Sequence, residues 1–299
     1  MKKLIAMLLA FILTAACFAG CAAATPATTT AAPNQDVAQT GEGTQPGDTV
    51  ATVETSLEAS QGTIVVGYTL YEPMNYIDEE SGELVGFDTE LAKAVFEGLG
   101  YTVIFQEIDW NAKYTDLNSG TIDCVWNGFT CNCADDDDGI QRAEKVDFSY
   151  NYMENRQVIV VKADSTIAAA ADLAGKLGAV ESGSAGETYA KGFEGATVKG
   201  CNVQTECLME VNSGAADFAV LDAQLAKAYV GNGDYAGLKI VEDLSSDVEY
   251  YAIGFKKGSE LTAQVNAQLE ALAADGTIAA LAEKYDVANT TITDFSDQK

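Results

Sequence analysis

The sequence contains no histidine, and only two of its 299 residues are arginines, Arg142 and Arg156. Histidine is a common general base and the commonest metal ligand in proteins, so its absence excludes His-based catalytic triads and His-containing zinc sites. Basic residues are scarce as a whole: 17 lysines and arginines stand against 45 acidic residues, which gives a net charge of −28. A surface this negative repels nucleic acid, so we expect no nucleic-acid partner.

Residues 1–21 are typical of a secretory signal peptide. Two lysines precede an uncharged apolar run, residues 4–20, which is too short to span a membrane. Small residues precede both Cys17 and Cys21, as in a lipobox, whose cysteine is acylated and becomes the new N-terminus. We favour Cys21 as the lipidated residue, which predicts a lipid-anchored protein at the extracellular face of the cell membrane. An ordinary secreted protein is the alternative.

The next segment, residues 22–60, is rich in alanine, threonine and glycine and has no aromatic residue. It also holds three of the four prolines of the chain. Such a segment cannot bury enough apolar surface to offset the entropy of ordering it. We expect a disordered tether between the membrane and a folded part that begins near Gly62.

Strand-like and helix-like segments alternate from Gly62 onward. Short apolar or β-branched runs such as TIVVGY, YTVIFQE and RQVIVVK predict strands. Amphipathic segments such as DTELAKAVFEGLG, with Asp88 as a candidate cap, predict helices. Repeated βα units predict an α/β protein with mostly parallel sheets, and two similar series of units predict two lobes.

Ligands of open α/β sheets bind beyond the carboxyl ends of the strands, so the residues that follow the predicted strands form the candidate site. Tyr71, Trp110, Thr130 and Asp222 each follow a different strand. A helix that opens near Ser184 offers unpaired N–H groups and a positive dipole to an anion. Asp222 can hold a cation, and the two aromatics can pack against flat apolar surface. A ligand with a carboxylate, an ammonium and a side chain satisfies all three features.

These residues also have structural explanations. Tyr71 and Trp110 could simply cap the core of a lobe, as aromatic residues often do. Asp222 could cap the helix that follows it. The combination of these residues at successive strand ends favours ligand binding.

Six segments in a consistent order make the chain similar to the polar amino-acid-binding proteins of ABC importers, the bacterial extracellular solute-binding proteins of family 3. The resemblance extends from about Gly62 to Val287 and is carried by YEPMNYID…GELVGFDTELAKAV, IDWNAKYTDLNSGTIDCVWNGFT, RAEKVDFS, AVESGSAGETYAK, ADFAVLD and EYYAIGFKKGSELTAQVNAQLEALAADGTIAALAEKY. It implies a two-lobed fold of the type II periplasmic-binding-protein class, a Venus flytrap with two hinge crossovers. The first lobe would comprise residues 61–156 plus 250–299, and the second lobe residues 157–249.

The resemblance implies a binding protein, with no enzymatic activity and no cofactor. A polar L-amino acid would be captured between the lobes and delivered by a monomeric, lipid-anchored protein to a membrane permease. Glu72 and Glu181 flank the expected pocket and could suit a basic or polar side chain, and cystine is also an open choice. The alternatives are a dehydratase-like enzyme on the same scaffold, with Glu181 as a positioned acid, and an acidic metal-binding lipoprotein.

The resemblance also implies roles for ten residues. In the family, the arginine four residues before a VDFS-like segment grips the ligand carboxylate; here it is Arg142, with Thr130 closing the grip. Asp222 would hold the ammonium, and Tyr71 and Trp110 would enclose the side chain. The other five positions lie at a strand end or a helix start: Asn127, Gly128, Ser182, Ser184 and Ala185.

The segment CNCADDDDGIQ, residues 131–141, is an insertion relative to the family. A longer loop could re-aim Arg142 or pair it with a local aspartate at the surface, which would leave Arg156 as a fallback. Four adjacent aspartates repel one another and predict a solvated tip.

A metal site in this insertion is disfavoured. A calcium loop of the EF type needs an acid at its first position and glutamate at its twelfth, where the chain has Ala134 and Lys145. Cys131 and Cys133 supply only two of the four ligands of a closed zinc site. We therefore expect no metal. Of the other cysteines, Cys201 and Cys207 could pair, and Cys124 is expected in the core.

Overall fold

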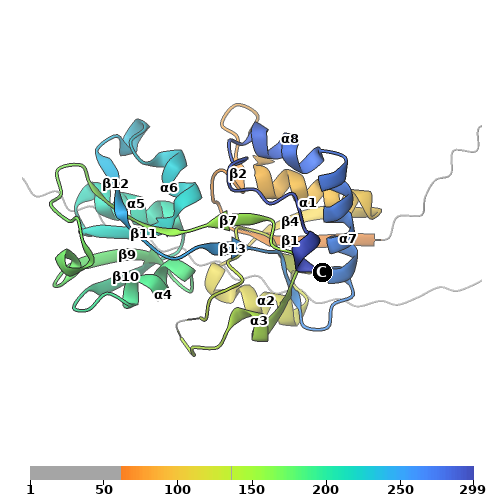
Figure 1. Cartoon of the computed structure of the whole chain (residues 1–299), viewed down its shortest axis with the longest axis horizontal. Coiled ribbons are helices and arrows are strands. Elements are labelled where there is room, and N and C mark those ends of the chain that lie inside the picture. Colours follow the sequence, from red (N-terminus) through yellow and green to blue (C-terminus); the bar gives the residue numbers. More distant parts are fainter. Residues whose placement is uncertain (1–61, 136) are drawn as a thin grey trace, which may run out of the picture. The chain divides into compact units, whose positions relative to one another are not determined.

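The computed structural model describes residues 62–135 and 137–299, which contain two five-stranded sheets joined by a two-stranded ribbon (Figure 1). These residues belong to one compact unit. The predicted signal peptide, the tether and Cys21 lie outside the described residues. Within the described part, no helix has both the length and the apolar character that a membrane crossing requires.

The first sheet has the strand order β4-β1-β5-β14-β6. Its strands are β1 (Gly62–Tyr68), β4 (Tyr101–Glu107), β5 (Cys124–Val125), β6 (Val146–Phe148) and β14 (Gly254–Lys256). Together with helices α1 (Phe87–Gly98), α2 (Lys113–Ser119), α3 (Arg142–Lys145), α7 (Leu261–Ala274) and α8 (Thr277–Lys284) it forms what we call the first lobe. Apolar residues such as Leu91, Val265 and Ile278 are fully buried in its core, because they lie on the inner faces of α1, α7 and α8.

The second sheet has the strand order β10-β9-β11-β8-β12. Its strands are β8 (Gln157–Lys162), β9 (Leu177–Glu181), β10 (Thr197–Cys201), β11 (Phe218–Asp222) and β12 (Leu238–Ser245). Helices α4 (Ala185–Lys191), α5 (Gln204–Ser213) and α6 (Ala223–Tyr229) complete the second lobe. Ile159, Val161 and Phe218 pack in one of its buried clusters.

Each sheet is mixed: four of its five strands run in one direction, as predicted, and one strand, β14 or β8, runs against them. β1 is parallel to β4 and β5, whereas β14 is antiparallel to β5 and β6. Likewise, β9 is parallel to β10 and β11, whereas β8 is antiparallel to β11 and β12. The antiparallel strands are those that enter a sheet directly from an extended crossover, without the crossover helix that a parallel neighbour requires.

The crossovers are β7 (Met153–Asn155) and β13 (Glu249–Tyr251), which pair with each other antiparallel and form the ribbon between the sheets (Figure 1). The remaining short elements are β2 (Tyr76–Ile77), β3 (Leu84–Val85) and the 3₁₀ turns η1 (Trp110–Ala112), η2 (Ala170–Leu173), η3 (Gly233–Tyr235) and η4 (Ser296–Gln298).

One local prediction is wrong. Asp88 does not cap α1: Gly86 occupies the cap position, and the buried Asp88 carboxylate accepts hydrogen bonds from the Gly128 amide at 2.8 Å and the Tyr152 hydroxyl at 2.9 Å. The segment EYYAIGF contains β13 and the start of β14, because the chain passes there from the ribbon into the first sheet.

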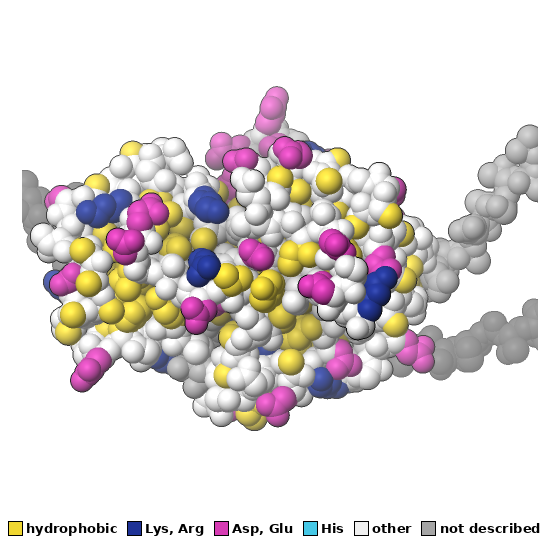
Figure 2. All heavy atoms as spheres, viewed as in Figure 1, with side chains coloured by type: hydrophobic (Ala, Val, Ile, Leu, Met, Phe, Trp, Pro, Cys, Tyr) yellow, Lys and Arg dark blue, Asp and Glu magenta, His cyan; other side chains and the backbone are white. Residues whose placement is uncertain are grey.

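The acidic surface is dispersed on the face shown in Figure 2, where acidic side chains are scattered over both lobes among apolar and uncharged groups.

Candidate binding site

Asp222 ends β11 and is held from several sides by amides. Its Oδ1 accepts hydrogen bonds from Asn155 Nδ2 and Gln157 Nε2, each at 2.6 Å, and its Oδ2 accepts one from Gln204 Nε2. Asp222 occupies the N-cap position of α6, as the alternative expected, but its side chain makes no capping bond there. Burial raises the pKa of Asp222, although these hydrogen bonds act in the opposite direction.

Glu249 of β13 shares the same amides. Its Oε2 accepts hydrogen bonds from Gln157 Nε2 at 2.9 Å, Thr130 Oγ1 at 3.2 Å and Asn155 Nδ2 at 3.3 Å. Burial and the Asp222 charge raise the pKa of Glu249 to about 7, against a usual value of 4.5. Glu249 is a candidate site residue that sequence reasoning missed, because it lies on a crossover strand and not at the end of a strand in either sheet.

Tyr71 reaches the same network through a second tyrosine. The Tyr71 and Tyr251 hydroxyls lie 2.7 Å apart, and burial together with the Asp222 charge raises the pKa of both. Gly128 packs against both rings: it has a φ of +56°, and a Cβ there would lie 2.7 Å from Tyr71 Cε1. A glycine is needed here because only glycine fits both the positive φ and the close approach.

Asn127 is engaged within the first lobe. Its Nδ2 donates to the Thr69 carbonyl at 2.8 Å and to Asn75 Oδ1 at 2.7 Å, and its Oδ1 accepts from Thr69 Oγ1 at 2.7 Å. This side chain therefore supports the floor of the site, and a contact with a ligand would come from its backbone.

Trp110 opens the turn η1 and packs edge-on against Phe129, with ring centroids 5.2 Å apart. Its Nε1 is buried and has no hydrogen-bond partner among the described residues. Trp110 and Tyr71 belong to different buried clusters. The two rings therefore do not pack in one apolar cluster of the described residues.

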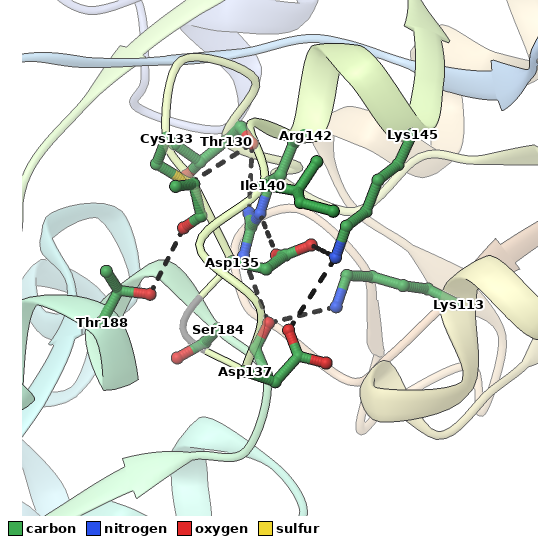
Figure 3. A network of polar contacts seen from close by, with 12 residues as sticks. Lys113, Thr130, Cys133, Asp135, Asp137, Ile140, Arg142, Lys145, Ser184 and Thr188 are labelled. Carbon is green, nitrogen blue, oxygen red and sulfur yellow. Dashed lines mark hydrogen bonds and ion pairs between the residues drawn. The ribbon is translucent and has the colours of Figure 1, made fainter.

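Arg142 begins α3, and its side chain is only 1% exposed. Its Nε donates to Asp135 Oδ1 at 2.8 Å, its Nη1 to the Thr130 carbonyl at 3.0 Å and its Nη2 to the Gly183 carbonyl at 3.1 Å (Figure 3). The expected alternative of an ion pair with a local aspartate is half right: the pair forms, but in the interior. Arg156 is exposed and donates to the Ser246 carbonyl, away from this network.

The insertion, residues 131–141, folds back on itself through an isolated bridge between Ala134 and Gln141. The prediction of a solvated acidic tip is wrong for Asp135, which is 5% exposed, whereas Asp137 is exposed. The described residues contain no group of three or more histidine, cysteine or acidic side chains placed to hold a metal ion.

The five cysteines of the described residues are free thiols, so Cys201 and Cys207 do not form the disulfide that we considered. Cys124 is fully buried in the core, as predicted.

The second lobe faces Arg142 with the start of α4. Ser184 caps α4, its Oγ accepting from the Glu187 amide at 3.1 Å, and Ala185 is buried in the first turn. The carbonyl of the preceding Gly183 accepts from both Arg142 Nη2 and Lys113 Nζ, each at 3.1 Å. Two cations of the first lobe thus converge on one oxygen of the second.

A cavity of about 290 Å³ lies beside this contact, and Ser182, Lys113 and Asp135 are among the residues that line it. Lys113 is 2% exposed, and its ammonium lies 5.0 Å from the centre of the Trp110 ring. Burial, together with the charge of Arg142, lowers the pKa of Lys113 to about 7. Sequence reasoning missed Lys113, because a lysine on a short amphipathic helix ordinarily faces solvent.

Glu181 ends β9 and is 5% exposed, and no hydrogen bond to its carboxylate is formed among the described residues. Burial and the Asp222 charge raise its pKa to about 8, although Lys113 and Arg142 act in the opposite direction. An unpartnered, buried carboxyl group of this kind can accept a cationic or hydrogen-bond-donating group.

Three of the predicted residues, Thr130, Arg142 and Asp222, belong to one polar network. Thr130 connects the Arg142 end to Glu249, and the shared amides of Asn155 and Gln157 connect Glu249 to Asp222. The arrangement presents a guanidinium and a carboxylate on different lobes, joined by one buried polar network.

Known proteins are similar to this chain over most of its described part. The family model of the bacterial extracellular solute-binding proteins, family 3, matches residues 64–288. The chain belongs to this family. Its residues are 31% identical over 232 residues to the arginine-binding extracellular protein ArtP of Bacillus subtilis, a match that covers 76% of this chain and 88% of ArtP. The match to the L-cystine-binding protein TcyA of the same organism is 30% identical and covers 83% of this chain and 88% of TcyA.

The fold is likewise that of a solved relative. An ancestral arginine-binding protein bound to arginine superposes with a TM-score of 0.69 and 37% identity, over 76% of this chain and 99% of that protein. The two-lobed, type II binding-protein fold predicted from the sequence is confirmed.

Proposed function

We propose that this family member captures a polar L-amino acid between its lobes and delivers it to an ABC permease, without catalysing a reaction. The observation that carries the proposal is the burial of Arg142 and Asp222 on different lobes of one polar network. Arginine binds a carboxylate through parallel N–H groups, and a buried carboxylate binds an ammonium. The two ends of a zwitterion match the two groups.

The other predicted residues have supporting roles in this proposal. Thr130 would close the carboxylate grip, Tyr71 and Trp110 would enclose the side chain, and the remaining positions would line the site: Asn127, Gly128, Ser182, Ser184 and Ala185. Closure of the lobes would follow from ligand contacts with both, since a ligand favours the state that it contacts more.

A basic side chain is the best candidate for the ligand. Glu181, Asp222 and Glu249 place three buried carboxyl groups in or beside the network, and none of them is paired with a lysine or arginine within 4 Å among the described residues. The relatives named as arginine-binding proteins are consistent with this choice.

Lipid anchoring at Cys21, with residues 22–60 as a tether and the protein acting as a monomer at the extracellular face of the membrane, is part of the same proposal. It is supported by the pattern of the first 21 residues and by membership of an extracellular family.

The test is a thermal-shift screen of the chain against the common L-amino acids and cystine. A ligand at about 100 times its Kd adds about 2.7 kcal/mol of stability, and Arg142→Met and Asp222→Asn should each abolish that gain. Unchanged melting with every compound would contradict the proposal. Turnover of prephenate in a parallel assay would favour the dehydratase alternative.

A further inference from the structure

The guanidinium of Arg142 is already occupied on all three of its nitrogens. Two acceptors are neutral backbone carbonyls, those of Thr130 and Gly183, and the third is the Asp135 carboxylate at 2.8 Å. A bidentate grip on a ligand carboxylate needs two parallel N–H groups on one edge of the guanidinium. Asp135 holds the Nε edge, so a ligand carboxylate cannot use that edge unless Asp135 leaves.

The charge of Asp135 also opposes the binding of a ligand carboxylate at Arg142. Arg142 and Asp135 are both buried, so their charges offset each other in a region where screening is weak. A second carboxylate that approached Arg142 would meet a site close to neutral and a like charge within contact distance. Burial on its own raises the pKa of Asp135, but the Arg142 charge and the Lys145 hydrogen bond outweigh it and lower the pKa to about 2. Asp135 therefore stays ionised at every physiological pH.

The surroundings of Asp135 also allow its side chain to rotate away from Arg142. Its Oδ2 already contacts Lys145 Nζ at 2.8 Å, as Figure 3 shows. It borders the cavity that Lys113 lines, and Lys113 has no carboxylate within 4 Å among the described residues. A rotation away from Arg142 would leave Asp135 between two lysines, so its charge would remain compensated.

From this geometry we infer that Asp135 is a built-in competitor for the ligand carboxylate, and that it determines how strongly this chain prefers a free acid to an uncharged analogue. The inference rests on the proposed function, because it assigns the carboxylate end of the ligand to Arg142. It also gives the insertion a role: residues 131–141 supply an internal carboxylate to the one arginine of the site.

The test compares L-arginine with L-argininamide in calorimetric titrations of the wild type and Asp135→Asn. The asparagine keeps an oxygen acceptor for Arg142 Nε but removes the charge. We expect L-arginine to bind about tenfold more tightly to the variant, and L-argininamide to change by less than about twofold, because one charge-assisted hydrogen bond differs. Asp137→Asn is the matched control, since Asp137 is 82% exposed, lies 3.8 Å from Lys145 and should leave both affinities unchanged.

A second variant keeps the test independent of the amino acid. Asp135→Ala leaves Arg142 without its carboxylate, so sodium acetate should raise its melting temperature more than that of the wild type. Acetate should also weaken L-arginine binding to this variant by competition. If Asp135 merely positioned Arg142, acetate would instead strengthen L-arginine binding.

The outcomes separate the two proposals. The inference is supported if Asp135→Asn binds L-arginine more tightly than the wild type while its affinity for L-argininamide is unchanged. It is overturned if the variant binds L-arginine equally or more weakly, or if the two affinities change by the same factor. If no protein binds any amino acid while acetate still stabilises Asp135→Ala, the proposed function fails and carboxylate exchange at Arg142 stands. Acetate without effect on Asp135→Ala overturns the exchange.

Discussion

Glu181→Gln should flatten the dependence of stability on pH between pH 5 and pH 7. The pKa of Glu181 is raised by burial and by Asp222 from 4.5 to about 8. A group with a raised pKa in the folded state holds more protons there than in the unfolded state. Its contribution to stability is therefore complete below about pH 4.5 and is lost as the pH rises through about 8.

The magnitude follows from the two pKa values. Each pH unit inside the window changes the free energy of unfolding by about 1.4 kcal/mol per group. Between pH 5 and pH 7 Glu181 alone should lower it by about 2–3 kcal/mol. Burial and Asp222 raise the pKa of Glu249 to about 7, so Glu249 also lowers the free energy of unfolding as the pH rises over this range. Lys113 adds little, since it stays mostly protonated in both states until about pH 7, where burial has placed its pKa.

The assay is urea denaturation of the wild type and Glu181→Gln at pH 5, 6 and 7 and constant ionic strength. We expect the wild type to lose about 2–3 kcal/mol more than the variant over this range. Asp137→Asn is the control, because Asp137 is exposed and its replacement should leave the slope unchanged. Parallel curves for the wild type and Glu181→Gln would show that Glu181 is ionised throughout, and the electrostatics of the site as described would be wrong.

Two further substitutions test the packing around the site. Gly128→Ala should lower the free energy of unfolding by about 2–4 kcal/mol, because it combines a positive φ with overpacking against Tyr71. Gly120→Ala is the comparison: its φ is +77°, nothing lies within 4 Å of the added Cβ, and it should lower the free energy of unfolding by only about 1 kcal/mol. Equal losses in urea denaturation would refute the close approach. Lys113→Met should raise the free energy of unfolding at pH 6 by about 2 kcal/mol, because burial lowers the pKa of Lys113 and a neutral side chain avoids the cost of burying a charge. A less stable variant would contradict this, since it would mean that the hydrogen bonds from Lys113 to the Trp110 and Gly183 carbonyls stabilise the fold by more than the burial of its charge destabilises it.

The sequence could predict the parts of the site that follow a general rule of the fold. Asp222 and Thr130 follow strands, and the strand ends of α/β sheets meet at one edge, so these residues converge without knowledge of the rest. Arg142 could be predicted from its position in the sequence, four residues before the segment VDFS that resembles the family's pattern. The second lobe could be separated from the first by the repetition of βα units, although the antiparallel entry of β8 and β14 could not be read from local patterns.

The missed residues are those whose local sequence looks ordinary. Glu249 lies on the crossover strand β13, where the alternation of polar and apolar residues does not show which other side chains it contacts. Asp135 is one of four adjacent aspartates, and no local signal distinguishes it from Asp137 and Asp138, which are exposed. Lys113 begins α2, directly after the turn that Trp110 opens, and the local sequence gives no sign of its hydrogen bond to the Gly183 carbonyl of the other lobe. In each case a long-range contact decides the environment.

The most direct test of the central claim is calorimetric titration with an amino acid and its two truncated forms: L-arginine, agmatine, which lacks the carboxylate, and 5-guanidinopentanoate, which lacks the ammonium. If Arg142 and Asp222 hold opposite ends of one ligand, arginine should bind at least about tenfold more tightly than either analogue, since each analogue lacks one of the two charge-assisted contacts. Equal affinity for all three compounds would contradict the claim.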